Sequence, residues 1–223
     1  MNKQEARAWI ERVGIVPVVR ASSAEEAVFA AQAIAHGGIS IVEITMTVPG
    51  AIEVIRNLVK TASGILVGAG TVVNAEAAQK CIDAGAQFLV SPGFNAGTVA
   101  AARERGILIM AGALTPTEVM AAWDAGSDFV KIFPCGTVGG AKYIKALKAP
   151  LPNIPMVPTG GVNLSTAADF IRAGAEALGI GGELMSGAVL QSGDARVITE
   201  TAMQFVSIVK DARTSGHVAT AAS

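Results

Sequence analysis

Two ionisable residues stand inside otherwise apolar segments of this sequence. Lys131 lies in DFVKIFP and Glu43 lies in IVEITMTVP, each late in a segment expected to form a β-strand. Burial disfavours a charged ammonium, and a neutral amine is a nucleophile toward a ketone. The plainer alternatives are a lysine whose end reaches solvent and a structural Glu43–Lys131 ion pair. Because a buried pair is costly to hold for stability alone, we favour a catalytic lysine and a proton-shuttling glutamate.

Glycine pairs follow two later apolar segments, in VPTGGVN (157–163) and LGIGGEL (178–184). Backbone N–H groups in such turns, and helix N-termini after them, can bind an anion. One glycine pair often does no more than turn the chain, but two pairs after consecutive strands predict a phosphate or carboxylate site. Arg20 ends the segment VPVVR and either serves the same anion or is simply solvated at a strand end. Thr71 in GAGTV and Pro92 in VSPGF either shape a small polar pocket or only turn the chain.

The elements that would position these residues form a repeat. Alanine-rich helical stretches end in glycine and are followed by short apolar strands. The expected strands are Gly14–Val19, Ile39–Met46, Ile65–Thr71, Gln87–Ser91, Ile107–Ala111, Asp128–Phe133, Pro155–Pro158 and Ala177–Ile180. Strands alternating with helices predict right-handed βαβ units and a parallel sheet, and eight such units close into an α/β (β/α)8 TIM barrel. An open doubly wound sheet is the alternative, but the dinucleotide fingerprint typical of that fold is absent from the sequence.

Helix boundaries are also marked. We expect left-handed helix ends at glycines, and helix starts at Ser22–Ser23, Asn74 and Thr115, with Pro116 and Glu118 completing the last start. The expected left-handed glycines are Gly37, Gly64, Gly85, Gly106, Gly126 and Gly174. Met1–Arg12 is predicted to be an additional N-terminal helix. Residues 1–213 are predicted to form a single barrel domain, and residues 214–223 a flexible C-terminal tail.

Composition excludes several functional classes. The formal net charge of the 223 residues is −1 without a basic stripe, so nucleic acid is not an expected partner. The two cysteines are too few for a disulfide scaffold, and the histidines, cysteines and aspartates show no metal-ligand spacing. Neither a signal sequence nor an apolar run of about 18 residues is present, so we expect a cytoplasmic protein without a membrane span. A Walker loop and a nucleophilic serine elbow are also absent.

Taken together, these segments resemble a known family. The segments VEITMTVPGA, VGAGTV, LVSPGF, TPTEVM, VKIFPCGTVGGAKYIKALKAPLPNIPMVPTGGVN and LGIGGEL are similar to those of class I 2-keto-3-deoxy-6-phosphogluconate (KDPG) aldolases, from about Gly14 to past Leu184. The resemblance implies a metal-independent aldehyde-lyase of the Entner–Doudoroff route that cleaves KDPG to pyruvate and glyceraldehyde 3-phosphate. Several members also split 4-hydroxy-2-oxoglutarate (KHG) to pyruvate and glyoxylate, and the family assembles as homotrimers.

The resemblance also assigns roles to residues of this chain. Lys131 matches the Schiff-base lysine and Glu43 the proton-shuttling glutamate, so the only covalent carrier is an imine on the protein and cofactors are not expected. The remaining matches are a pyruvate pocket of Thr71, Pro92, Phe133 and Thr159, phosphate loops at Gly160, Gly161, Gly181 and Gly182, and a basic position at the mouth, Arg20.

Two positions depart from part of the family. Thr47 stands where some members have an arginine that helps to hold the substrate carboxylate, so we count Thr47 among the substrate-binding residues and expect the carboxylate to be held differently. Gly182–Glu183 replaces a serine beside the last phosphate loop, and we expect Glu183 to face away from the phosphate, in the first turn of a helix.

Three other functions remain open on the sequence. A phosphate-binding isomerase or epimerase would use Glu43 as a carbon base without forming an imine. A binding protein would have lost the chemistry, against which the presence of both Lys131 and Glu43 argues. Among aldolases, one for the galactonate-derived epimer of KDPG is the nearest rival.

Overall fold

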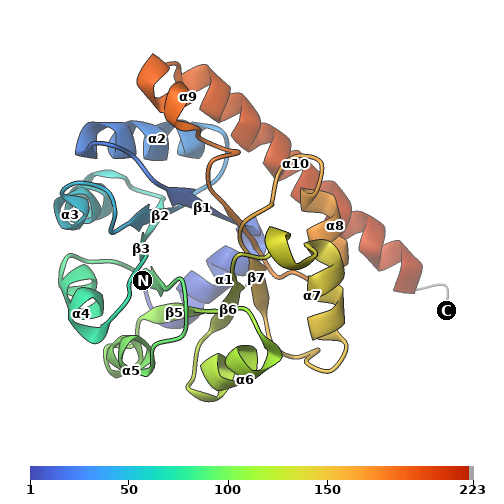
Figure 1. Ribbon diagram of the computed structural model, residues 1–223. Coiled ribbons are helices and arrows are strands. Elements are labelled where there is room, and N and C mark those ends of the chain that lie inside the picture. The colour runs from blue at the N-terminus through green and yellow to red at the C-terminus, as the bar shows by residue number, and fades with distance from the viewer. Residues whose placement is uncertain (221–223) are drawn as a thin grey trace.

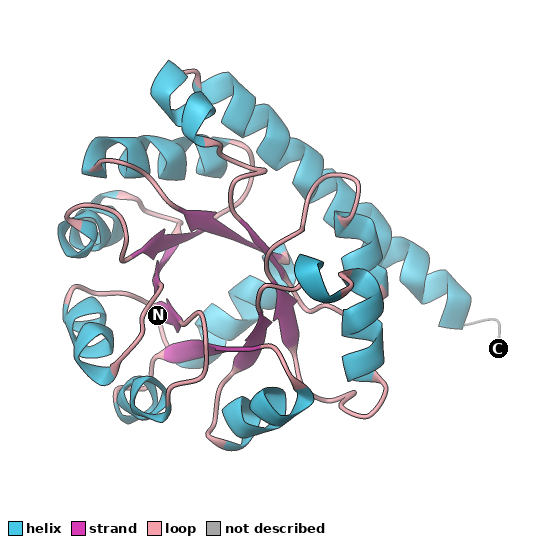
Figure 2. Ribbon diagram, in the orientation of Figure 1, coloured by secondary structure: helices cyan, strands magenta, loops and turns pink. Residues whose placement is uncertain are grey.

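The computed structural model (Figure 1) describes residues 1–220, with the backbone alone for 215–220. Eight parallel strands form one sheet in the order β7-β6-β5-β4-β3-β2-β1-β8, and helices surround it (Figure 2). The strands are β1 Ile15–Val19, β2 Ile41–Thr45, β3 Leu66–Gly70, β4 Phe88–Val90, β5 Leu108–Ala113, β6 Phe129–Ile132, β7 Met156–Pro158 and β8 Leu178–Ile180. All eight expected strands are confirmed, and the fold is a TIM-barrel-like α/β fold.

Helices precede, connect and follow the strands. They are α1 Lys3–Val13, α2 Ala24–His36, α3 Ala51–Thr61, α4 Ala75–Asp83, α5 Ala96–Glu104, α6 Pro116–Asp124, α7 Ala141–Lys148, α8 Ala167–Arg172, α9 Gly187–Ser192 and α10 Ala195–Thr220, with a 3₁₀ turn at Gly136–Val138. The predicted N-caps are confirmed: the side chains of Ser23, Asn74 and Thr115 accept backbone N–H groups, and Thr115 and Glu118 form a capping box. Because these capping signals are local, the helix starts could be predicted from the sequence.

Side chains of alternate strand residues separate into two sets. Ile41, Phe88 and Phe129 belong to an apolar cluster inside the barrel, whereas Val42 and Ile44 belong to the larger cluster between the strands and the helices. Because successive residues of a strand point to opposite faces, a residue two positions after an inner one is also inner. Glu43 follows Ile41 by two residues and Lys131 follows Phe129 by two, so both side chains lie inside the barrel.

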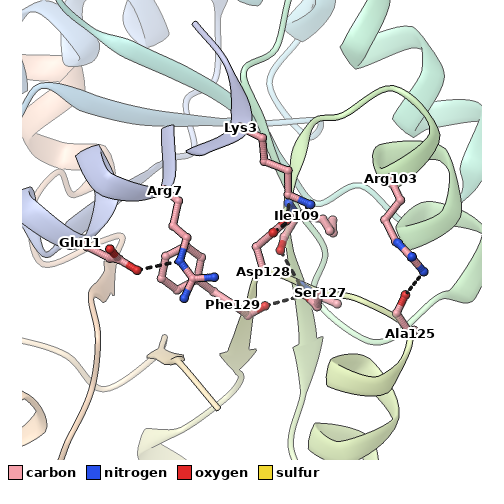
Figure 3. A network of polar contacts seen from close by, with 10 residues as sticks. Lys3, Arg7, Glu11, Arg103, Ile109, Ala125, Ser127, Asp128 and Phe129 are labelled. Atoms are coloured by element: carbon pink, nitrogen blue, oxygen red, sulfur yellow. Dashed lines mark hydrogen bonds and ion pairs between the residues drawn. The ribbon is translucent and has the colours of Figure 1, made fainter. Parts of the chain in front are cut away.

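Helix α1 closes the end of the barrel where the strands begin. Ala6 and Ile10 of α1 are buried in the inner cluster with Phe129. Figure 3 shows the polar contacts at its edge: Lys3 lies 2.9 Å from the carboxylate of Asp128, and the Arg7 guanidinium lies 5.3 Å from the centre of the Phe129 ring. The predicted N-terminal helix is therefore confirmed, and it forms the floor beneath the inner face of β6.

One predicted helix end was wrong. Gly37 has a φ of −78°, and the neighbouring Gly38, with a φ of +90°, adopts the left-handed conformation instead. A Cβ atom on Gly37 would lie only 2.4 Å from the Cβ of Ala202 in α10. Gly37 is thus required by the close packing of two helices rather than by its backbone angle. The other expected glycines all have a positive φ.

The two ends of the sheet meet at an incomplete seam. β7 and β8 share a single parallel bridge, between Thr159 and Gly179, whereas each is paired along three residues with its other neighbour. Helix α10 packs against α2 and α8 and continues to Thr220, into the segment expected to be a tail; residues 221–223 of that segment lie outside the described residues. Within residues 1–220, no helix has the length and apolar character needed to cross a bilayer.

Candidate active site

Lys131 and Glu43 meet inside the barrel. They come from β6 and β2, which three strands separate along the sheet, and they are only 4% and 2% exposed. Lys131 Nζ lies 3.9 Å from Glu43 Oε1 and 5.5 Å from the centre of the Phe133 ring. A separation of 3.9 Å is too long for a hydrogen bond, and the amine donates none to any described residue. The pair is therefore close but not locked together, which leaves the amine available to a ligand.

The carboxyl group of Glu43 lacks a polar partner of its own. Among the buried side-chain atoms of the described residues, Glu43 Oε1 is without a hydrogen bond. Burial raises the pKa of Glu43, while the positive charges of Lys131 and Arg20 act in the opposite direction. An unpaired buried acceptor costs stability, and such groups in native structures are concentrated where chemistry occurs. A raised pKa brings the carboxyl group toward the range in which it can both accept and donate a proton near neutral pH.

A hollow of about 240 Å³ opens above this pair, at the carboxyl ends of the strands. Phe133 lies two residues after Lys131 on the same face, and Thr159 lies two residues after Val157, which is paired with Lys131 in the sheet. The hollow thus forms the next layer outward from the amine. Its lining includes the predicted residues Arg20, Phe133, Thr159, Gly160, Gly161, Gly181 and Gly182.

The glycine loops present unused hydrogen-bond donors to this hollow. Within residues 1–220, the N–H groups of Gly161 and Gly182 donate no hydrogen bond, whereas the N–H of Gly160 belongs to the bridge between Thr159 and Gly179. The carbonyl oxygen of Gly181 accepts from Leu184 and, at 3.3 Å, from Met185, which closes the turn after β8. Free N–H groups from two loops and the Arg20 guanidinium form a suitable environment for a phosphate.

The expected relation of these loops to helices was wrong. α8 begins at Ala167 and α9 at Gly187, so several residues separate each glycine pair from the following helix. Glu183 lies in a turn rather than in a first helical turn, and it is one of the exposed residues that line the hollow. Glu183 borders the hollow, so the expectation that its carboxylate faces away from the phosphate stays a prediction, and the candidate anion-binding groups are loop N–H groups and Arg20.

Thr71 has a strained backbone. It has a φ of +59° and is the non-glycine residue with positive φ within the described part of the chain. A β-branched residue in this conformation is an outlier that costs about 1–3 kcal/mol, and such strain is commonly found at functional sites. Thr71 immediately follows Gly70, which contacts Glu43, so the strain lies next to the Glu43–Lys131 pair.

Pro92 is brought to the strand beside Lys131. A Cβ atom on Gly112 would lie 2.3 Å from the carbonyl carbon of Pro92, so the chain after β4 crosses directly over Gly112. Gly112 is paired with Lys131 in the sheet. The buried Ser91 fixes this crossing, because its Oγ accepts from Gly112 N–H at 3.1 Å and donates to the Gly93 carbonyl oxygen at 2.7 Å.

Thr47 lies outside the residues that line the hollow, and its hydroxyl is already engaged. Thr45 Oγ1 donates to the Val19 carbonyl oxygen at 3.0 Å, which uses its only hydrogen. Thr47 Oγ1 lies 2.7 Å from Thr45 Oγ1 and must be the donor in that contact. Thr47 therefore has no free hydrogen to offer a carboxylate in this arrangement.

Sequence reasoning missed the glycines on the inner face of the barrel. A Cβ atom on Gly70 would lie 1.8 Å from Glu43 Oε1, and one on Gly179 would lie 2.0 Å from Thr159 Oγ1. These glycines make room for functional side chains of other strands. The available signal was strand alternation, since Gly68 and Gly70 follow Leu66 at steps of two on the inner face.

The two cysteines are not among the residues that line the hollow. Cys81 and Cys135 are free and buried, and burial raises the pKa of each thiol to about 11. Among the described residues, His, Cys, Asp and Glu side chains form no group of three or more that could hold a metal ion.

Comparisons with known proteins agree on one family. The sequence model for KDPG and KHG aldolases matches residues 7–201. The chain is 38% identical over 201 residues to the 2-dehydro-3-deoxy-phosphogluconate aldolase of Treponema pallidum, covering 90% of this chain and 95% of the relative. It is 34% identical to the KHG/KDPG aldolase of Escherichia coli K12, covering 93% and 98%. The crystal structure of KDPG aldolase from Legionella pneumophila, with pyruvate captured as a covalent carbinolamine intermediate, matches with a TM-score of 0.83 at 28% identity, covering 89% of this chain and 96% of that one.

Proposed function

The chain belongs to the KDPG and KHG aldolase family and is a carbon–carbon lyase, and from this premise we propose that it cleaves KDPG to pyruvate and glyceraldehyde 3-phosphate through an imine on Lys131. The observation that carries the proposal is the juxtaposition of Lys131 Nζ and a buried, unpartnered Glu43 carboxyl group 3.9 Å away. The KHG/KDPG relative supports 4-hydroxy-2-oxoglutarate as a second substrate.

The first half of the proposed reaction builds an electron sink. The neutral amine of Lys131 attacks the C2 carbonyl carbon and forms a carbinolamine. Glu43 then protonates the departing hydroxyl, so that water leaves and a protonated imine remains. The Glu43 carboxylate accepts the proton of the C4 hydroxyl, the C3–C4 bond breaks, and its electron pair moves into the imine to give an enamine. Glyceraldehyde 3-phosphate leaves at this point.

The second half regenerates the amine. Glu43 returns a proton to C3 of the enamine, which restores the protonated imine of pyruvate. Addition of water at C2 and departure of the amine release pyruvate and free Lys131. The phosphate does not react; its binding to the N–H groups of Gly161 and Gly182 would orient the C3–C4 bond.

Trapping the imine tests the proposal directly. The protein is incubated with pyruvate and borohydride, digested and analysed by mass spectrometry. We expect one reduced pyruvate adduct on Lys131, none in Lys131→Ala, and retro-aldol turnover reduced at least roughly 10³-fold in that variant. Lys148, which donates to backbone carbonyl oxygens near β7, provides the matched control: Lys148→Ala should trap normally. An unmodified Lys131 in active wild-type protein would refute the mechanism.

Substrate preference is tested by turnover of KDPG, its galactonate-derived epimer and 4-hydroxy-2-oxoglutarate side by side. We expect the highest kcat/KM for KDPG, because KHG carries no phosphate for the glycine loops. A higher kcat/KM for the galactonate epimer would assign the chain to that substrate instead.

We also propose a homotrimer in the cytoplasm. Large apolar side chains are exposed on several loops after the strands and could be covered by another copy: Val73, Phe94, Val138 and Leu164. A cytoplasmic location suits phosphorylated substrates, which do not cross a bilayer unaided. Native mass spectrometry would test the assembly, and a monomer would contradict it.

A further inference from the structure

The position of the Glu43 carboxyl group is not explained by hydrogen bonds. Its Oε1 atom is buried without a partner among the described residues, and its contact with Lys131 is too long to fix its direction. A free carboxyl group on a flexible side chain would otherwise occupy several rotamers. What holds it facing Lys131 must therefore be the shape of the surrounding barrel wall.

Gly70 of β3 provides that shape. An added Cβ atom there would lie 1.8 Å from Glu43 Oε1, 2.5 Å from Cδ and 2.6 Å from Cγ, so the carboxyl group rests directly on the bare α-carbon. Gly70 is absent from the residues with positive φ, and β3 is an ordinary strand at this point. The backbone would accept any L-residue here, and only the contact with Glu43 requires glycine.

We propose that Gly70 is a positioning residue whose missing side chain seats the Glu43 carboxyl group against Lys131. This inference rests on the proposed role of Glu43 as the proton shuttle. A methyl group on Gly70 would push the carboxyl group off its seat by more than an ångström, because an approach of 1.8 Å is far inside van der Waals contact. Dehydration of the carbinolamine would slow, but the imine on Lys131 would still reach its equilibrium level, whereas proton transfer to and from the pyruvate carbon would fail.

The experiment compares two readouts in Gly70→Ala. Borohydride trapping with pyruvate reports the imine, and exchange of the pyruvate methyl hydrogens for deuterium, followed by NMR, reports proton transfer. We expect the final yield of trapped adduct, measured after imine formation has reached equilibrium, to stay within about threefold of wild type. Exchange should fall on the order of 10²-fold, the usual size of a general acid–base contribution.

Two further variants separate positioning from a general loss of structure. Gly68→Ala adds a methyl group on the same face of the same strand, but its Cβ would meet the Phe88 ring at 2.4 Å rather than Glu43. Its folded fraction should exchange pyruvate hydrogens at close to the wild-type rate. In Gly70→Ala/Glu43→Asp, the shorter acid leaves room for the methyl group, so exchange should be faster than in Gly70→Ala, although Glu43→Asp alone is slower than wild type.

The outcomes distinguish this inference from the proposed function. Wild-type protein that neither traps nor exchanges would overturn the imine mechanism itself. If wild type does both and Glu43→Gln loses exchange, then wild-type exchange in Gly70→Ala, or failure of the Asp variant to rescue it, would overturn the positioning role alone. Should Gly70→Ala not fold by circular dichroism, the double variant decides: folded and exchanging protein supports the role, and unfolded protein overturns it.

Discussion

At the scale of single residues, burial governs the proton chemistry of Glu43. Desolvation is the largest influence on its carboxyl group and raises its pKa above the ordinary value of 4.5, against the positive charges of Lys131 and Arg20. The carboxylate form, which is the base, therefore appears only at a pH higher than usual. The rate of proton removal by Glu43 should therefore rise with pH, whereas the contribution of Glu43 to the stability of the fold should fall over the same pH range.

The first prediction concerns the pH dependence of methyl exchange on pyruvate. Because exchange needs the carboxylate to remove a proton, its rate should rise as pH increases through a midpoint above 4.5 and be lost below that midpoint. Glu43→Gln should give a rate roughly 10²-fold lower that lacks this limb. NMR exchange rates between pH 4 and 8 provide the measurement, and a midpoint at or below 4.5 in wild type would contradict the role of burial.

Stability should follow the opposite sign. Between the unfolded pKa and the raised folded pKa of Glu43, the native state binds more protons than the unfolded state. The contribution of Glu43 to the free energy of unfolding is therefore fully present below the unfolded pKa and is lost as pH rises through the folded pKa. The slope is at most about 1.4 kcal/mol per pH unit for one proton. Urea unfolding at several pH values should show this decline in wild type and its absence in Glu43→Gln. Parallel curves for the two proteins would argue against it.

The third prediction is that replacing Thr47 and replacing Arg20 have different effects on KM. Since Thr47 donates its hydrogen to Thr45, Thr47→Val should change KM for KDPG and for 4-hydroxy-2-oxoglutarate by less than about threefold. Arg20 lines the hollow with the glycine loops, so Arg20→Ala should raise KM about tenfold or more for KDPG, a loss of about 1.4 kcal/mol, and much less for the unphosphorylated substrate. Steady-state kinetics would show it, and equal losses on both substrates would place Arg20 at the carboxylate instead.

At the scale of elements, α1 supports the site from below. Ile10 is fully buried in the inner cluster with Phe129, and Phe129 precedes Lys131 by two residues on the same face of β6. The helix is held by its capping box between Asn2 and Glu5 and by the Lys3–Asp128 ion pair. The floor of the barrel therefore depends on a helix that lies outside the repeating βα units.

Replacing Ile10 by alanine should lower the free energy of unfolding by about 2–5 kcal/mol, because it leaves a cavity beneath the barrel interior. Gln4→Ala, at an exposed position of the same helix, should change it by less than about 0.5 kcal/mol. Urea denaturation followed by circular dichroism measures both. A cost below about 1 kcal/mol for Ile10→Ala would show that α1 is not an integral part of the barrel core.

The sequence predicted the helices and strands better than the loops and contacts between them. The strands, and caps such as Ser23, Asn74 and Thr115, were readable because apolar runs and capping residues act within a few positions. The start of α9 at Gly187 could not be predicted in this way. The glycine pair at 181–182 suggested a helix N-terminus at that position, but a loop follows the pair instead. Gly37 was misassigned because its reason is a contact with Ala202, far along the chain.

The candidate site divides in the same way. Lys131 and Glu43 were recognisable because a charged residue in an apolar strand is rare, and strand alternation places both inside the barrel. The seating of Glu43 on Gly70 and the engagement of the Thr47 hydroxyl depend on distances between neighbouring strands and loops. Such contacts are set by the register of the folded sheet and leave no local pattern in the sequence.

At the scale of the whole molecule, the barrel is weakly paired at one position in its ring of strands. β7 and β8 meet through the single bridge between Thr159 and Gly179. The two loops with free N–H groups follow these same strands, with Gly161 after β7 and Gly182 after β8. A phosphate bound to both loops would therefore link the two sides of the seam and stabilise the closed ring.

Amide hydrogen exchange should reveal this coupling. In the free protein, amides of β7 and β8 should exchange faster than those of β3 and β4, since ladder hydrogen bonds protect the latter on both sides. Inorganic phosphate at ten times its dissociation constant should stabilise the closed seam by about 1.4 kcal/mol and slow exchange there about tenfold, while β3 and β4 change little. Mass spectrometry of peptides covering 155–162 and 177–183, with chloride at equal ionic strength as the control, measures it. Uniform slowing around the barrel would mean that phosphate does not bind across the seam, because only a ligand held by both loops protects that seam selectively.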